Sequence, residues 1–203
     1  MSSLPPIIRE APPEGTHRVL LTISYDGTAY AGWQLQENAV AVQQRVEEAL
    51  WKLTGESIRV TGASRTDAGV HAMGQRAHFD TFSRIPPEKY PFALNTCLPR
   101  DIRVLAGRAV PSDFHARFDA RGKRYTYRVH NAPHASALLR DLTAHVPQAL
   151  DVERMRQSLQ CLLGTHDFAA FQASGGTAKT TVRTLSAAPD ASSVCMLTLT
   201  VRG

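Results

Sequence analysis

An aspartate and an arginine two residues apart lie in a short segment that connects two strand-like runs. The segment comprises residues 64–72, and within it are Arg65 and Asp67. A carboxylate is a moderate nucleophile and a good leaving group, and a neighbouring guanidinium can keep it ionised or bind a phosphate. Gly62 and Gly69 bracket the turn and allow backbone angles that other residues resist. An arbitrary Arg-x-Asp is more often a turn-capping carboxylate with a surface ion pair. Only the flanking sequence can distinguish this structural role from a functional one.

The elements around this segment place it on a loop. Residues 57–61 predict a short strand and residues 74–82 a second one, so Asp67 lies on the connection between them. Loops held by a rigid sheet are where functional residues concentrate. The position of Asp67 therefore favours a functional role.

The first half of the chain alternates strand and helix patterns. Residues 19–25 alternate apolar and polar side chains, which predicts a strand that ends at an Asp-Gly turn. Apolar residues recur at helical spacing over residues 42–53, and Gly55 ends this helix. Residues 86–94 predict a short helical piece and residues 101–110 a further strand. This order indicates an α+β fold, with helices on one face of a sheet.

The second half begins with a strand over residues 123–130. Its alternation places Tyr125 and Tyr127 on one side and polar residues on the other. Tyr127 is expected to be a core residue. The proline-containing segment 1–15 predicts a flexible leader. Residues 111–115 cross into the second part, so we expect an N-terminal α/β domain over residues 16–110 and a C-terminal α/β domain over 111–203, which the family resemblance described below implies to be incomplete.

The remaining elements are a helix and a closing strand pair. Asp151 is a good N-cap for the helix, and Gly164 is its expected terminator. Residues 180–188 and 194–201 predict the two strands, and Gly175-Gly176 predicts a mobile loop before them.

The composition is that of an ordinary globular protein with a basic balance. The 203 residues carry 23 Lys and Arg against 18 Asp and Glu, which gives a net charge of +5 and weakly favours a polyanionic partner. Cys97, Cys161 and Cys195 are widely spaced among apolar neighbours, and they indicate buried thiols in a reducing compartment. No run approaches the roughly 20 apolar residues that span a bilayer, and no secretory signal is recognisable, so we expect a cytoplasmic protein.

Four ordered blocks of this sequence resemble the tRNA pseudouridine synthase A family. They are residues 25–36, 65–72, 95–102 and 114–127, and the second reads Arg-Thr-Asp-Ala-Gly-Val-His-Ala. Ser64 departs from the Gly that the family usually has, although a small residue remains. The resemblance implies the pseudouridine synthase fold, a mainly antiparallel sheet flanked by helices and built from two similar α/β units.

The resemblance also implies a reaction. The family converts uridine to pseudouridine without a cofactor, in the anticodon stem-loop of tRNAs at uridines 38, 39 and 40. By its match to the motif Asp67 is the catalytic nucleophile, which attacks either C6 of the uracil or C1′ of the ribose. Arg65 would keep Asp67 ionised and contact a phosphate near the flipped nucleotide.

Tyr125 matches the family tyrosine that lines the pocket beside the base. Flipping a stacked base costs a few kcal/mol, which stacking on an aromatic ring offsets. Tyr125 is also a candidate for handling the C5 proton. The alternative is that Tyr125 is simply a core aromatic on the buried face of its strand.

Two further groups of residues are candidates for substrate binding. Asp26, Tyr30 and Trp33 belong to a glycine-containing loop whose rings either stack on the substrate or cover the edge of the core. A basic run before Tyr125 suits a phosphate backbone, although each member alone is more often a solvated surface residue. The run consists of His115, Arg117, Arg121, Lys123 and Arg124.

Two other functions remain open. The resemblance also implies a homodimer. Family members usually continue for several tens of residues beyond the end of this chain, and for that reason a non-catalytic RNA-binding or tRNA chaperone protein on the same scaffold is the runner-up. An exposed strand edge and an incomplete pocket would then lower stability and activity. A metal-dependent nuclease would use Asp67, His71, His78 and Asp80, but no established ligand pattern supports it.

Overall fold

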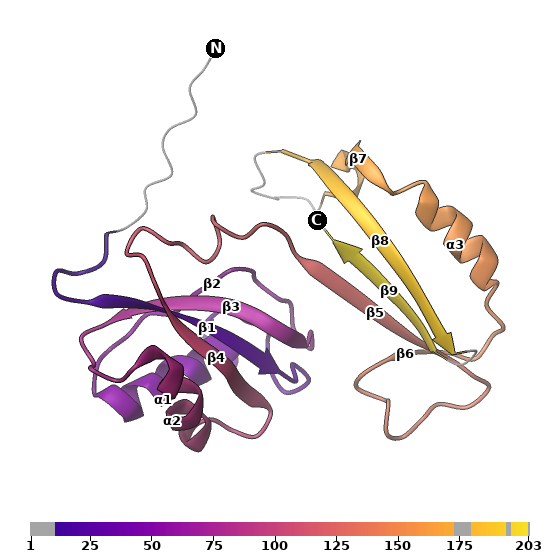
Figure 1. Ribbon diagram of the computed structural model, residues 1–203. Coiled ribbons are helices and arrows are strands. Elements are labelled where there is room, and N and C mark those ends of the chain that lie inside the picture. The colour runs from indigo at the N-terminus through magenta and orange to yellow at the C-terminus, as the bar shows by residue number, and fades with distance from the viewer. Residues whose placement is uncertain (1–10, 173–179, 194–195, 203) are drawn as a thin grey trace, which may run out of the picture. The chain divides into compact units, whose positions relative to one another are not determined.

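The computed structural model describes residues 11–172, 180–193 and 196–202, and of residues 187–193 and 196–202 the backbone alone. The chain forms two compact units, one that ends at Ala120 and one that begins at Arg121 (Figure 1). The division therefore falls after the segment 111–119 and not at residue 110, where the pattern placed it. The reason is that this segment is hydrogen-bonded to the sheet of the first unit.

The first unit is an antiparallel sheet with two helices on one face, as the sequence predicts (Figure 1). The strand order is β2-β3-β1-β4, and every neighbouring pair is antiparallel. The strands are β1 (His17–Tyr25), β2 (Thr61–Gly62), β3 (Ala72–Thr81) and β4 (Ile102–Val110). The helices are α1 (Val42–Thr54), the 3-10 turn η1 (Pro87–Lys89) and α2 (Tyr90–Cys97).

The core of this unit lies between the sheet and its helices. Alternate residues of β1, such as Leu21 and Ile23, belong to one buried cluster with Leu50 of α1 and Leu94 of α2. This is the face that the alternation over residues 19–25 assigns to the interior. Gly55 ends α1 as predicted, because it takes a left-handed conformation with φ 73° that a glycine adopts without strain.

The strand predicted over residues 57–61 is shorter than expected. Only Thr61 and Gly62 pair with β3. The backbone of Val60 is held by side chains of α1 instead: its N–H donates to Glu47 over 2.9 Å, and its carbonyl accepts from Gln43 over 3.1 Å. These bonds satisfy the backbone without a partner strand.

The second unit is a five-stranded sheet in the order β6-β5-β9-β8-β7. The β5–β6 pair is parallel and the other neighbouring pairs are antiparallel. The strands are β5 (Arg124–Asn131), β6 (Ala144–Val146), β7 (Gly164–Asp167), β8 (Val182–Ser193) and β9 (Met196–Arg202). The other elements are α3 (Val152–Gln160) and the 3-10 turn η2 (Ala169–Phe171).

The sequence predicted the cap and the end of a helix in this unit and the pairing of its last two strands. Asp151 caps α3 as expected, since its carboxylate accepts from the N–H of Arg154 over 2.9 Å. Gly164 as the terminator is wrong, because α3 ends at Gln160 and Gly164 begins β7. The pairing of the last two strands is confirmed. The Gly175-Gly176 loop lies outside the described residues.

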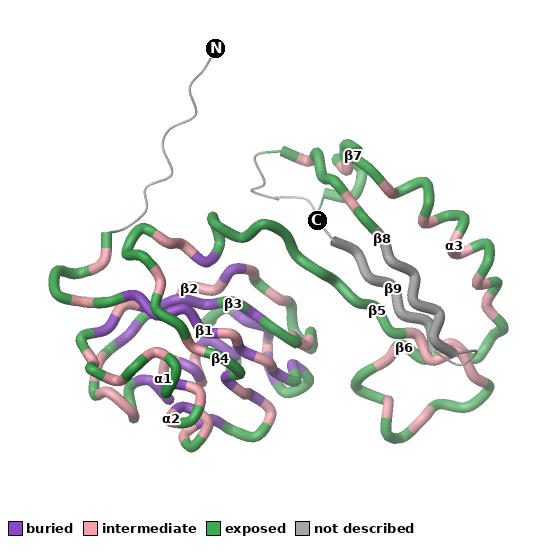
Figure 2. The backbone as a smooth tube through the Cα atoms, viewed as in Figure 1, coloured by how far each residue is buried: buried purple, intermediate pink, exposed green. Residues whose placement is uncertain are grey.

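The two units differ in how far their described side chains are buried. All buried side chains that the structure describes belong to the first unit, as the purple segments of Figure 2 show. Tyr127 is 61% exposed, so its assignment to a core is wrong. Cys161 is also exposed rather than buried, Cys97 is half-buried, and Cys195 lies outside the described residues. Among the described helices, none has the length and apolar character that a bilayer crossing requires.

Candidate active site

The segment that carries Asp67 is a loop between β2 and β3, as predicted. Its first residues are fixed to β3: the N–H of Ala63 donates to the carbonyl of Arg76 over 2.7 Å, and the side chain of Gln75 donates to the carbonyl of Ser64. Gln75 is buried, which makes this contact a rigid one. The loop therefore leaves the sheet in a defined direction.

Asp67 lies at the tip of the loop and is exposed. Its carbonyl accepts from the N–H of Val70 over 3.2 Å, which closes a turn. Gly69 has φ 77° within that turn, and its N–H donates to the carbonyl of Tyr30 over 3.1 Å. A residue with a Cβ would be strained at this φ. The turn thus presents the carboxylate outward while its backbone is held from below.

The support comes from a second loop, residues 26–33, which lies directly against the first. Trp33 donates its backbone N–H to the carbonyl of Thr66 over 3.1 Å, and the Tyr25 hydroxyl bonds the Thr66 hydroxyl over 2.8 Å. A Cβ on Gly32, which has φ 91°, would lie 2.2 Å from the Thr66 oxygen. A Cβ on Gly27 would lie 2.1 Å from the carbonyl oxygen of Val70. The two backbones are therefore in contact, and only glycine permits the approach.

Tyr30 and Trp33 are core residues of this support. They are 7% and 3% exposed. The Tyr30 hydroxyl donates to Asp101 over 2.8 Å, and burial together with this carboxylate raises the pKa of Tyr30 to about 12. The Trp33 ring packs beside Tyr25, at 6.0 Å between ring centroids. Their burial agrees with the interpretation that these rings cover the core edge, and stacking on a substrate stays a prediction.

Asp26 and His71 join the two loops. The hydroxyl and N–H of Thr28 donate to the Asp26 carboxylate over 2.6 and 3.0 Å, and they lower the pKa of Asp26, with a smaller contribution from His71. Nδ1 of His71 lies 3.0 Å from the same carboxylate oxygen and 3.2 Å from the N–H of Gly27. Nδ1 accepts from Gly27 when it carries no hydrogen and donates to Asp26 when it carries one. His71 thus bonds the backbone of the second loop.

Arg65 and Asp67 are both exposed, but they do not form an ion pair. The ion pairs found among the described residues join other partners. That Arg65 keeps Asp67 ionised and contacts a phosphate therefore stays a prediction.

The remaining candidates are divided between the two units. His115 and Arg117 belong to the first unit, whereas Arg121, Lys123, Arg124 and Tyr125 belong to the second. His115 is half-buried and stacks on Phe118 with 4.2 Å between ring centroids. The side chains of Arg117, Arg121, Lys123 and Arg124 are exposed. Tyr125 is 46% exposed on β5, so the alternative of a core aromatic does not describe it.

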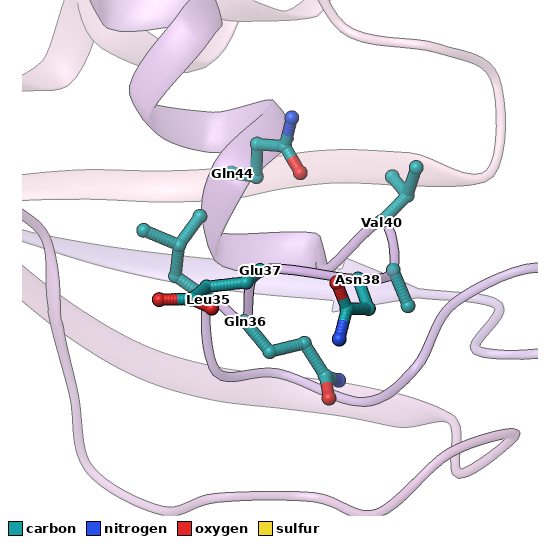
Figure 3. Close-up of a pocket in the computed structure, with 7 residues that line it drawn as sticks. Leu35, Gln36, Glu37, Asn38, Val40 and Gln44 are labelled. Atoms are coloured by element: carbon teal, nitrogen blue, oxygen red, sulfur yellow. The ribbon is translucent and has the colours of Figure 1, made fainter.

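A metal centre finds no support in the part of the chain that the structure describes. His78 and Asp80 lie two residues apart on β3, but no group of three or more potential ligands gathers among the described residues. A shallow hollow of about 530 Å³ lies in the loop before α1 and is formed by residues 35–40 and Gln44. Figure 3 draws the side chains that line it. None of the candidate site residues lines this hollow.

The sequence analysis missed the residues that hold the site in place. Thr66 and Gln75 bond the loop, and Gly32 allows the second loop to approach it. Arg18 was also missed, although a charged residue at the start of an apolar strand was a signal. Arg18 bonds Asp80 and the carbonyl of Phe114, which are far away in the sequence.

Comparison with known proteins identifies the class to which this fold and loop belong. A family model described as tRNA pseudouridine synthase matches residues 21–119. The tRNA pseudouridine synthase A of Ruminiclostridium cellulolyticum is 51% identical over 166 residues, and that of Acetivibrio thermocellus is 53% identical over 167 residues. Each match covers 82% of this chain and 68% of the relative. The chain therefore belongs to the tRNA pseudouridine synthase A family.

Proposed function

We propose that this chain isomerises uridine to pseudouridine in tRNA, with Asp67 as the nucleophile. One observation carries the assignment to Asp67. Its carboxylate is exposed at the tip of a loop whose backbone is hydrogen-bonded on two sides, to β3 and to residues 26–33. A fixed backbone with an accessible carboxylate is the preorganisation that nucleophilic catalysis needs. The target is the anticodon stem-loop, at uridines 38, 39 and 40.

The reaction balances without a cofactor. The bond between C1′ and N1 breaks, the base turns, and a bond between C1′ and C5 forms. N1 gains a proton, C5 loses one, and no electrons are exchanged with another molecule. Asp67 adds to C6 or to C1′ and leaves again, so it returns to its starting state at the end of each turnover.

The other candidate residues bind and orient the RNA in this proposal. Tyr125 stacks on the flipped uracil and assists the transfer of the C5 proton. Arg65 binds a phosphate near the target nucleotide. The basic residues Arg117, Arg121, Lys123 and Arg124 bind the phosphate backbone, which their exposure permits. Four further residues contribute to substrate binding indirectly, because they hold the backbone of the neighbouring loops in place. They are Asp26, Tyr30, Trp33 and His115.

We infer two further properties from the family alone. The chain acts in the cytoplasm, and it functions as a homodimer. Sedimentation of the purified chain at micromolar concentration tests the second property, and a single monomeric species would overturn it.

Tritium release from C5-labelled uridine in an unmodified tRNA tests the function. Release by the unmutated chain, none by Asp67→Ala, and full release by Glu88→Gln, which changes an exposed carboxylate in η1, are the expected results. Release should persist in EDTA, because no metal takes part. Binding without release by the unmutated chain would show an RNA-binding protein instead. Equal release by Asp67→Ala would refute the nucleophile.

A further inference from the structure

A buried polar cluster lies on the sheet face of the first unit that the helices do not cover. The Arg18 guanidinium donates to both carboxylate oxygens of Asp80 over 2.7 Å each. It donates once more, over 2.6 Å, to the carbonyl of Phe114. The side chains are 4% and 20% exposed. Bidentate bonds are strong and directional, so Asp80 fixes the orientation of the Arg18 guanidinium. The fixed guanidinium then holds the carbonyl of Phe114 in one place.

His78 holds the same segment at a second point. Its Nδ1 accepts from the N–H of Ala116 over 3.1 Å. Burial, together with the charge of Arg18 and the neighbouring His115, lowers the pKa of His78 to about 4. The ring is therefore neutral at physiological pH, and Nδ1 has the lone pair that this bond requires.

The segment held by these contacts packs on the root of the Asp67 loop. Ala116 forms a small buried cluster with Leu20 of β1 and Ala63. Ala63 directly precedes the loop, and its N–H is bonded to β3. The position of Ala116 is thereby coupled to the point at which the loop leaves the sheet.

The residues after Ala116 form an ordered turn. The N–H of His115 donates to the Asp119 carboxylate over 2.7 Å, and the N–H of Asp119 donates back to the carbonyl of His115 over 2.9 Å. Nδ1 of His115 accepts from the N–H of Arg117 over 3.2 Å. The Arg117 side chain is exposed on this turn. The turn has a defined backbone, and it presents one guanidinium to the solvent.

We propose that His78 and the Arg18–Asp80 pair are positioning residues, which hold the segment 111–119 on the root of the Asp67 loop so that Arg117 meets the tRNA backbone in a fixed register with Asp67. The proposal rests on the proposed function. Apolar residues would hold two segments together equally well, because a buried ion pair adds little stability over a packed apolar group. Directional polar bonds at Phe114 and Ala116 specify a single placement of the segment 111–119. Stability alone does not require so specific a placement.

Double-mutant analysis of binding tests this proposal without turnover. The probe is a fluorescent anticodon stem-loop RNA, with Kd measured by anisotropy at two salt concentrations for the whole chain. His78→Leu removes the acceptor, and Arg117→Ala removes the phosphate contact. We expect each to raise Kd by about three- to tenfold and to lower the salt slope by about one. The double variant should raise Kd no further, because His78 acts through Arg117.

Two controls separate positioning from stability. His78→Asn retains an acceptor, Oδ1, which lies as many bonds from the backbone as Nδ1, and it should restore most of the affinity. Leu94→Ala removes a buried side chain of α2 on the helix-covered face, and it should lower the melting temperature without changing Kd. Additive effects of His78→Leu and Arg117→Ala, or equal loss of affinity in Leu94→Ala, would overturn the proposal. So would an unchanged Kd in either single variant. Failure of the isomerase proposal appears separately, as missing tritium release by the unmutated chain.

Discussion

At the scale of single residues, the glycines that border the Asp67 loop have distinct tasks. Gly69 supplies a left-handed backbone within the turn, with no atom near its missing Cβ. Gly62 lies against the indole of Trp33, and Gly32 lies against the carbonyl of Thr66. The first task concerns conformation, whereas the other two concern close approach, and substitutions can distinguish them.

Gly32→Ala should displace the Asp67 loop. The new Cβ would lie 2.2 Å from the Thr66 oxygen, so one of the two backbones has to move. We expect a loss of kcat of about a hundredfold, as for other displacements of a catalytic group by about 1 Å. Gly55→Ala is the matched control, because its φ of 73° is similar but nothing lies near its Cβ. Equal loss of kcat in both variants would mean that destabilisation alone is responsible.

Tyr125 and Tyr127 lie on the same face of β5, so they form a matched pair for a test of stacking. Tyr125→Ala should reduce tritium release by about a hundredfold or more, if its ring and hydroxyl serve the flipped base. Tyr127→Ala changes a more exposed ring and should leave release nearly intact. Tyr125→Phe separates the two roles, because it keeps the ring and removes the hydroxyl. Similar rates for the two alanine variants would refute a special role for Tyr125.

At the scale of elements, β3 carries the loop on one side and His78 in its middle. Four charged or titratable side chains face His78. They are Arg18 of β1, Asp80 of the same strand, and His115 and Asp119 of the segment 111–119. The strand therefore links the Asp67 loop to a buried titratable group, and the stability of the fold should depend on pH through that group.

The free energy of unfolding should fall as the pH is lowered from 6.5 towards 4. The folded-state pKa of His78 is about 4 against 6.5 in the unfolded chain, so the unfolded state binds more protons in this window. Stability therefore rises with pH there, by about 3 kcal/mol over the whole window. Urea unfolding at pH 4.5, 5.5 and 7 measures it. The His78→Gln variant should show a shallower slope over this range, and an unchanged slope would contradict the assignment.

At the scale of the whole molecule, the division after Ala120 predicts where the chain can be cut. A fragment that ends at Ala120 keeps the core between sheet and helices together with the small cluster of Leu20, Ala63 and Ala116. Compactness with its own core is what allows a domain to fold alone. The boundary is thus a statement about packing, and it can be tested by truncation.

The fragment of residues 1–120 should unfold cooperatively in a thermal melt followed by circular dichroism. A fragment of residues 1–110 lacks the segment that covers Leu20 and accepts the third bond of Arg18, so it should melt several degrees lower. Exposure of a buried apolar residue and the loss of one of the three hydrogen bonds of the Arg18 guanidinium are the reasons. Equal melting temperatures would show that the segment 111–119 does not belong to the first unit.

The sequence by itself determined several local elements and the family to which the chain belongs. The alternation of β1, the apolar spacing of α1 with its Gly55 stop and the cap at Asp151 are local patterns, and they were found in the structure at these places. The motif around Asp67 identified the family. These features depend on neighbours a few residues away, which a sequence displays directly.

Only the tertiary structure decided which side chains support the site. Arg18 reaches Asp80 and Phe114, and the Tyr25 hydroxyl meets Thr66, across long intervals of sequence. The burial of Tyr30 and the shortness of β2 likewise depend on partners that no local pattern reveals. Propensity and periodicity act between near neighbours, whereas packing and buried hydrogen bonds join segments that only folding brings together, and so the loop was predictable but its support was not.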